Sequence, residues 1–151
     1  MELSFTKMQG TGNDFVVIDA TKKPFSLSTD TIRSLADRRY GIGFDQMLVV
    51  QPDETGQADF CYRIFNADGG EVAMCGNGAR CFALYVRSHG LTQKDRIRVR
   101  TMSGIITPEI LSDRTVRVDM GCPNFCPKNV PFTPESFESV SRKDAVLYRT
   151  K

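Results

Sequence analysis

A thiol stands directly before a glycine-rich turn within residues 66–80, where Cys75 is followed by Gly76, Asn77 and Gly78. A helix is expected to begin at this turn, and a cysteine beside a helix N-terminus lies at the positive end of the helix dipole, which favours the thiolate form. The unpaired amides of the first helical residues bind anions, and glycine has no side chain to keep a carboxylate away from them. The segment therefore offers a proton-transfer group and a carboxylate site side by side.

This pairing suits the removal of the α-proton of an amino acid. Negative charge then builds up on the carbon and on the adjacent carboxylate, and donors aimed at the carboxylate stabilise that charge. A nearby thiolate can act as the general base. The lysines lie outside the glycine-rich turns, so the sequence presents no residue for a pyridoxal Schiff base.

Other functions for this segment are less well supported. Cys75 could be a small buried hydrophobic residue. A dinucleotide-binding turn would need a third glycine where Cys81 stands. A zinc or redox module could combine Cys122 and Cys126 with one of these cysteines or with His89, but the paired Cys-x2-Cys spacing of such modules is missing.

The elements that must position the thiol are mainly strands. Alternating and continuous apolar runs predict strands at residues 3–5, 15–18, 47–50, 60–65, 96–100 and 116–120, with a hairpin connection at residues 111–114. Two helices are predicted, one over about 31–39 with Asp30 as N-cap and Gly41 past its end, and one over about 78–88 closed by Gly90. An α+β fold with a mostly antiparallel or mixed sheet curled around one central helix would bury these apolar faces.

The proline-rich character after Met120 predicts a domain boundary. We expect residues 1–120 to form an N-terminal domain that carries Cys75, and residues 121–151 to form the junction and the start of an incomplete second domain. A net charge of +2 gives no reason to expect nucleic acid or a membrane as partner, and arginines at 96, 98 and 100 alternate as on the solvated face of a strand. Five cysteines, an odd number, favour a reducing cytoplasmic setting.

At these residues the sequence resembles the diaminopimelate epimerases. Four motifs occur in the family's order, and a further match marks the junction to the second domain. The matching stretches are residues 8–19, 41–46, 62–69, 75–81 and 118–121. The similarity spans roughly residues 1–133.

The resemblance implies that Cys75 is one of two cysteines acting on opposite faces of the substrate α-carbon, with no metal and no organic cofactor. One thiolate removes the proton while the other thiol delivers one from behind. The resemblance also implies a set of substrate-binding residues that contact polar groups or hold the reacting carboxylate: Asn13, Gln46, Asn66, Gly76 and Asn77. The expected reaction interconverts LL- and meso-diaminopimelate.

The chain departs from the family in length, because diaminopimelate epimerases carry two similar domains with the active site between them. No second cysteine lies in a Cys-Gly-x-Gly setting here. We therefore expect a fragment that lacks the second, C-terminal domain, is inactive alone and can form a homodimer. Other isomerases of the same fold, the proline racemases and the phenazine-pathway type, remain the alternative enzymes.

Overall fold

The computed structural model describes residues 3–124, 139–142 and 145–148. The chain divides into two compact units, Met1–Met120 and Gly121–Lys151. In the second unit, β10 (Ser139–Arg142) pairs antiparallel with β11 (Ala145–Tyr148). Cys126 lies outside the described residues, and the assignment of residues 121–151 to the start of a second domain stays a prediction.

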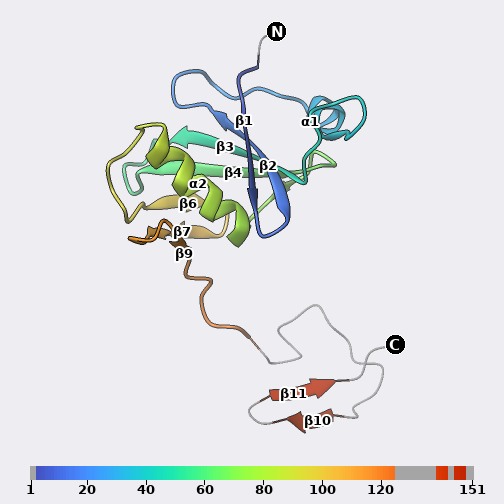
Figure 1. Cartoon of the computed structure of the whole chain (residues 1–151), viewed down its shortest axis with the longest axis vertical. Coiled ribbons are helices and arrows are strands. Elements are labelled where there is room, and N and C mark those ends of the chain that lie inside the picture. The colour runs from blue at the N-terminus through green and yellow to red at the C-terminus, as the bar shows by residue number, and fades with distance from the viewer. Residues whose placement is uncertain (1–2, 125–138, 143–144, 149–151) are drawn as a thin grey trace. The chain divides into compact units, whose positions relative to one another are not determined.

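The first unit is built on a mixed seven-stranded sheet with the order β1-β2-β3-β4-β6-β7, and β5 pairs with β4 (Figure 1). The strands are β1 (Thr6–Gly10), β2 (Asn13–Asp19), β3 (Gln46–Pro52), β4 (Phe60–Asn66), β5 (Glu71–Val72), β6 (Val99–Thr101) and β7 (Gly104–Ile106). The pairs β2–β3 and β4–β6 are parallel, and the remaining pairs in the sheet are antiparallel. The expected α+β class with a mixed sheet is confirmed.

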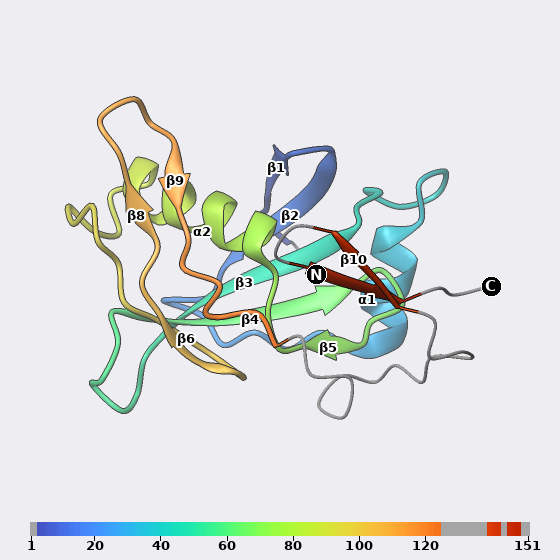
Figure 2. The ribbon, with the colours of Figure 1, turned by 90° about the horizontal axis from the view of Figure 1, so that it is seen from below.

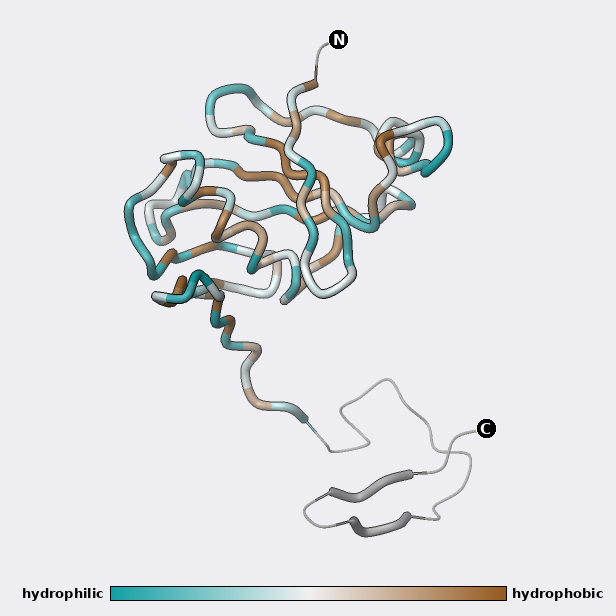
Figure 3. Tube along the Cα trace, in the orientation of Figure 1, coloured by the Kyte–Doolittle hydropathy of each residue, from teal (hydrophilic) through white to brown (hydrophobic). Residues whose placement is uncertain are grey.

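The two helices pack on opposite faces of this sheet because side chains alternate along each strand. Helix α2 (Gly76–Ser88) covers the face that carries Phe15, Leu48 and Tyr62, whereas α1 (Thr29–Ala36) covers the face of Val16 and Met47 (Figure 2). Figure 3 shows that the brown, apolar stretches follow the central strands. The strands between the helices are thus buried on both sides.

Helix α2 is held from two directions. It contacts β1, β2 and β3 of the sheet and also a small hairpin of β8 (Glu109–Ile110) and β9 (Val116–Arg117). The hairpin turns at residues 111–114, as predicted, and Arg114 takes a positive φ of 66° there. Strand β9 is shorter than the predicted strand over 116–120, and no strand was predicted at the position of β8. Among the described residues, no helix is long and apolar enough to cross a membrane.

Several element boundaries differ from the sequence prediction. The strand predicted at residues 3–5 is wrong, since β1 begins at Thr6. The predicted Asp30 N-cap is also wrong: Ser28 caps α1, and its Oγ accepts from the Thr31 amide at 3.2 Å. Asp30 instead pairs with Arg33 inside the first turn at 2.9 Å. Both serine and aspartate are good N-caps, so local sequence could not separate them.

A tight hairpin places the start of β2. Gly10 pairs with Asn13, and the two loop residues Thr11 and Gly12 have φ values of 54° and 87°. Positive φ at both positions is the type I′ geometry that matches the twist of paired strands. The hairpin therefore places Asn13 at the end of the sheet where α2 also begins.

Candidate active site

Cys75 is itself the N-cap of α2. Its backbone is extended, with φ −145° and ψ 111°, and its Sγ accepts from the Gly78 amide at 3.3 Å. The helix therefore begins at Gly76, two residues earlier than predicted, because the sulfur takes the place of the usual cap oxygen. The amides of Gly76 and Asn77 are the first two of the helix and have no carbonyl within it to bond. The half-buried thiol thus stands beside two helical amides that can donate to an anion.

The three amide side chains implied by the family resemblance lie at one end of the sheet. Asn13 and Gln46 begin the parallel strands β2 and β3, and Asn66 ends the antiparallel β4. In the strand register Gln46 lies opposite Phe15 on one side and Asn66 on the other. By alternation, all three share the sheet face that α2 covers.

Hydrogen bonds join these three side chains and that of Asn77 in two pairs. Asn77 Nδ2 donates to Asn13 Oδ1 at 2.8 Å, which ties the first turn of α2 to the start of β2. Gln46 Nε2 donates to Asn66 Oδ1 at 2.8 Å across the β3–β4 pair. The structure therefore brings Asn13 to Asn77 and Gln46 to Asn66, at the end of the sheet where Cys75 caps the helix.

An ionic network of Asp14, Arg38 and Asp45 supports the Asn13 side chain. Asn13 Nδ2 donates to Asp45 Oδ2 at 3.2 Å, and Arg38 bonds both Asp45 and Asp14 at 2.8 Å. The Arg38 guanidinium and then the Lys7 ammonium hold the pKa of the Asp14 carboxyl well below its usual range, although desolvation opposes them. The network positions Asn13 through charges that stay paired at neutral pH.

An open pocket of about 610 Å³ lies over the start of α2. Its walls come from the first helical turn and from the segment that includes β9: Cys75, Gly76, Asn77, Arg80, Val116, Arg117, Val118 and Met120. Met120 lies against the start of the helix, with its Sδ 2.9 Å from the point where a Cβ on Gly76 would stand. The pocket therefore combines the thiol, the two open amides and two guanidinium groups with an apolar wall.

Arg80 also belongs to this site, although it was not among the residues predicted from the sequence. It donates to Thr11 Oγ1 at 2.6 Å and to the side-chain oxygen of Asn77, so it links the β1–β2 hairpin to the helix. Its spacing of three residues from Asn77 places both on one helix face, and that spacing was the available signal.

The other described cysteines have different surroundings. Burial raises the pKa of the Cys61 and Cys81 thiols, and Cys122 is exposed in the second unit. Over the part of the chain that the structure describes, no group of three or more histidine, cysteine or acidic side chains could hold a metal ion. His89 stacks on Tyr85 with ring centroids 4.0 Å apart.

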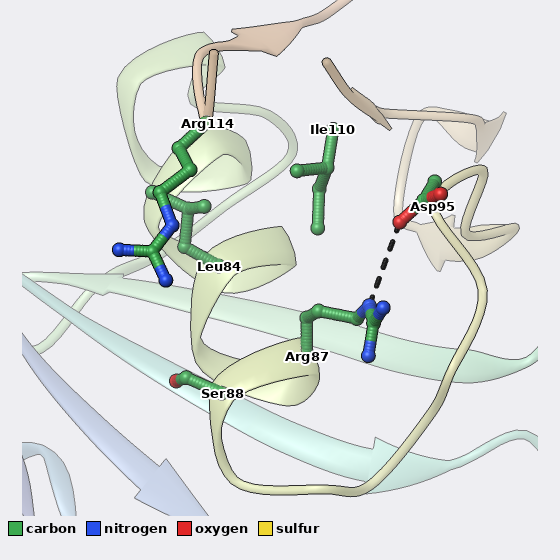
Figure 4. Close-up of a pocket in the computed structure, with 6 residues that line it drawn as sticks. All are labelled: Leu84, Arg87, Ser88, Asp95, Ile110 and Arg114. Atoms are coloured by element: carbon green, nitrogen blue, oxygen red, sulfur yellow. Dashed lines mark hydrogen bonds and ion pairs between the residues drawn. The ribbon is translucent and has the colours of Figure 1, made fainter. Parts of the chain in front are cut away.

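A second pocket lies at the opposite end of α2, against the β8–β9 hairpin (Figure 4). Arg87 bonds Asp95 at 3.5 Å on one side, and Arg114 borders it on the other. It shares no residue with the pocket over Cys75.

A family model and individual relatives match this chain under the same description. The family described as "Diaminopimelate epimerase" matches residues 5–126. Diaminopimelate epimerases of Laribacter hongkongensis and Nitrosospira multiformis are 53% and 56% identical to this chain over 98% and 89% of its length. These matches cover 51% and 48% of the two relatives, so the chain spans about half their length.

Solved structures of other proteins are similar to this chain in fold. A methylitaconate-delta-isomerase is similar with a TM-score of 0.59 at 14% identity, covering 82% of this chain and 66% of that one. A hydroxyproline epimerase from Agrobacterium vitis, with bound trans-4-hydroxy-L-proline, is similar with a TM-score of 0.55 at 15% identity, covering 74% of this chain and 39% of that one. At such identities the likeness shows a shared fold and does not select among the isomerases.

Proposed function

The chain belongs to the diaminopimelate epimerase family, and we propose that it supplies one of two thiols that interconvert LL- and meso-diaminopimelate. The observation that carries this proposal is the position of Cys75, whose sulfur caps α2 beside the open amides of Gly76 and Asn77. A base and a carboxylate site next to each other are what abstraction of an α-proton requires.

In the proposed reaction, the Cys75 thiolate and a second thiol face opposite sides of the substrate α-carbon. One thiolate takes the α-proton and becomes a thiol, while the other thiol gives its proton to the opposite face and becomes a thiolate. The configuration is inverted, and the two sulfurs have exchanged protonation states. Either direction is available because each residue can start as base or as acid.

The substrate groups are proposed to lie as follows. The reacting carboxylate accepts from the amides of Gly76 and Asn77, whose orientation at the helix N-terminus stabilises the charge that develops as the proton leaves. Gln46 uses its nitrogen on Asn66, so its oxygen is the end that can accept from a substrate ammonium. Asn13 holds the Asn77 side chain in place.

A second thiol has to come from elsewhere. Within the described residues Cys75 is the sole cysteine lining the pocket, and Cys81 is buried in the same helix. We propose that the second thiol belongs to the part of the family's proteins that this chain does not match, and that the chain alone does not epimerise. Formation of a homodimer and a cytoplasmic location stay predictions.

The test is proton exchange at the α-carbon of LL-diaminopimelate in D₂O, followed by proton NMR. Two proteins are compared: the 151-residue chain, and the same chain joined to the unmatched part of the Laribacter hongkongensis relative. Cys75→Ala is introduced in both, with Cys61→Ala as the matched control, since Cys61 lies on β4 in another pocket with Asp53 and Arg100.

We expect exchange with inversion in the joined protein, its loss in Cys75→Ala, and its retention in Cys61→Ala. Inversion by the 151-residue chain alone would refute the need for an outside thiol. Exchange that survives Cys75→Ala would refute the assignment of the base.

A further inference from the structure

Tyr62 carries a buried hydroxyl that lies below the N-terminus of α2. The residue stands in the middle of β4 and is 2% exposed. Among the described residues, its hydroxyl oxygen is the buried side-chain nitrogen or oxygen that has no hydrogen-bond partner. A buried polar atom without a partner destabilises a protein, so its retention calls for an explanation.

The hydroxyl faces the same point of the helix as the Cys75 sulfur. A Cβ built on Gly78 would stand 2.3 Å from the Tyr62 oxygen and 3.4 Å from Cys75 Sγ. The oxygen and the sulfur can therefore be no farther apart than the sum of these two distances. Gly78 has no side chain that would stand between the oxygen and the sulfur.

The hydroxyl stays protonated near neutral pH and can therefore donate a hydrogen bond. Burial raises the pKa of Tyr62 well above its usual range, and negative charge on Cys75 and Cys81 raises it further. A protonated phenol beside a neutral thiol gains little, because a thiol sulfur is a weak acceptor. Beside a thiolate the same hydroxyl makes a charge-assisted hydrogen bond.

We propose that Tyr62 is a positioning residue for Cys75, whose hydroxyl donates a hydrogen bond to the sulfur once the sulfur is a thiolate. This inference rests on the proposed function, in which Cys75 alternates between thiol and thiolate. The Gly78 amide donates to the sulfur from the helix, and Tyr62 supplies a second donor from the sheet. Unlike the amide, the Tyr62 hydroxyl does not belong to α2, so its effect on the sulfur is separate from that of the helix dipole.

Other groups near the sulfur also influence its charge. Arg80 on α2 and Arg117 on β9 border the same pocket, and Cys81 follows one and a half turns along the helix. Their effects remain when only the Tyr62 hydroxyl is removed, so a single-atom change isolates its contribution.

The experiment measures the rate at which iodoacetamide alkylates Cys75 as a function of pH, in the 151-residue chain, with peptide mass spectrometry to assign the site. Tyr62→Phe removes the oxygen and keeps the ring. Tyr85→Phe is the matched control, because Tyr85 is also buried, on α2, but stacks on His89 away from the pocket. We expect Tyr62→Phe to raise the midpoint of the Cys75 profile by about one pH unit, equivalent to about 1.4 kcal/mol, and Tyr85→Phe to leave it unchanged.

An unchanged midpoint in folded Tyr62→Phe protein overturns the inference, and so does an equal shift in Tyr85→Phe. A purely structural role for the hydroxyl would change the melting temperature without moving the midpoint. If Tyr62→Phe does not fold, 3-fluorotyrosine at position 62 replaces it: its more acidic hydroxyl should lower the midpoint, and no lowering overturns the inference. The Cys75→Ala exchange experiment tests the proposed function separately, so failure of Tyr62 leaves that result standing.

Discussion

Replacing Gly78 by alanine would add a methyl group to the tight contact between α2 and β4. The new Cβ would lie 2.3 Å from the Tyr62 oxygen and 3.2 Å from Leu48 Cδ2. Both neighbours are buried, at 2% and 0% exposure, and the tyrosine ring is rigid, so neither can move aside easily. The substitution therefore has two opposing effects on stability: a gain in helix propensity and a steric clash.

The two contributions have comparable size. Alanine in place of glycine stabilises a helix interior by up to about 1 kcal/mol. Overpacking a core costs about 1–3 kcal/mol. Since the closest approach is well below van der Waals contact, we expect the clash to dominate and Gly78→Ala to lower the free energy of unfolding by about 1–2 kcal/mol.

Urea denaturation followed by circular dichroism at 222 nm measures this difference, since the chain has no tryptophan for fluorescence. Gly76→Ala is the matched control on the same helix, because its new methyl would meet only Met120, which is 59% exposed and flexible. Without a clash against buried atoms, we expect the control to keep the gain in helix propensity and to change the free energy of unfolding by between 0 and about +1 kcal/mol.

A double-mutant cycle identifies the atom responsible. Tyr62→Phe removes the oxygen nearest to the new methyl, so combining it with Gly78→Ala should recover about 1 kcal/mol relative to the sum of the single changes. If Gly78→Ala alone stabilised the protein by its full propensity gain, the close contact between α2 and β4 would be refuted.

Three further outcomes follow from the site and its supports. In the joined protein described above, Cys75→Ala should reduce epimerisation at least about 100-fold, the lower range for loss of a general base. The fold should be retained, with the free energy of unfolding lowered by about 1 kcal/mol because the sulfur also caps α2; near-normal turnover would contradict its role. Iodoacetamide at pH 7 should modify Cys75 before Cys61, because burial raises the pKa of the Cys61 thiol; peptide mass spectrometry that found equal labelling would count against this order. The lowered pKa of the Asp14 carboxyl contributes stability that is present above its unfolded pKa of about 4 and is lost as the pH falls through the lower folded value. Arg38→Gln should therefore lower the free energy of unfolding at pH 7, and progressively less on acidification below pH 4. A pH-independent effect in urea titrations would refute that ion pair.

Local spacing alone was enough to predict much of the fold. The alternation of Phe60, Tyr62 and Ile64 with polar neighbours predicted β4 and its buried face, and the end of α2 before Gly90 followed from composition. These features depend on residues that are only a few positions apart in the sequence, and the periodicity of apolar residues predicts structure over that range. The Cys75 motif at a helix N-terminus is of the same local kind.

The supports of the site were decided by the tertiary structure. Asn77 meets Asn13 across 64 positions of sequence, and Gln46 meets Asn66 only because β3 and β4 pair in one particular register. A shift of one residue in that register would turn Gln46 to the other face of the sheet. Whether the Tyr62 hydroxyl finds a partner likewise depends on the distance between a strand and a helix, which no local pattern encodes. A chemical role for the thiol could be proposed from neighbouring residues, whereas its surroundings exist only once the sheet has assembled beneath α2.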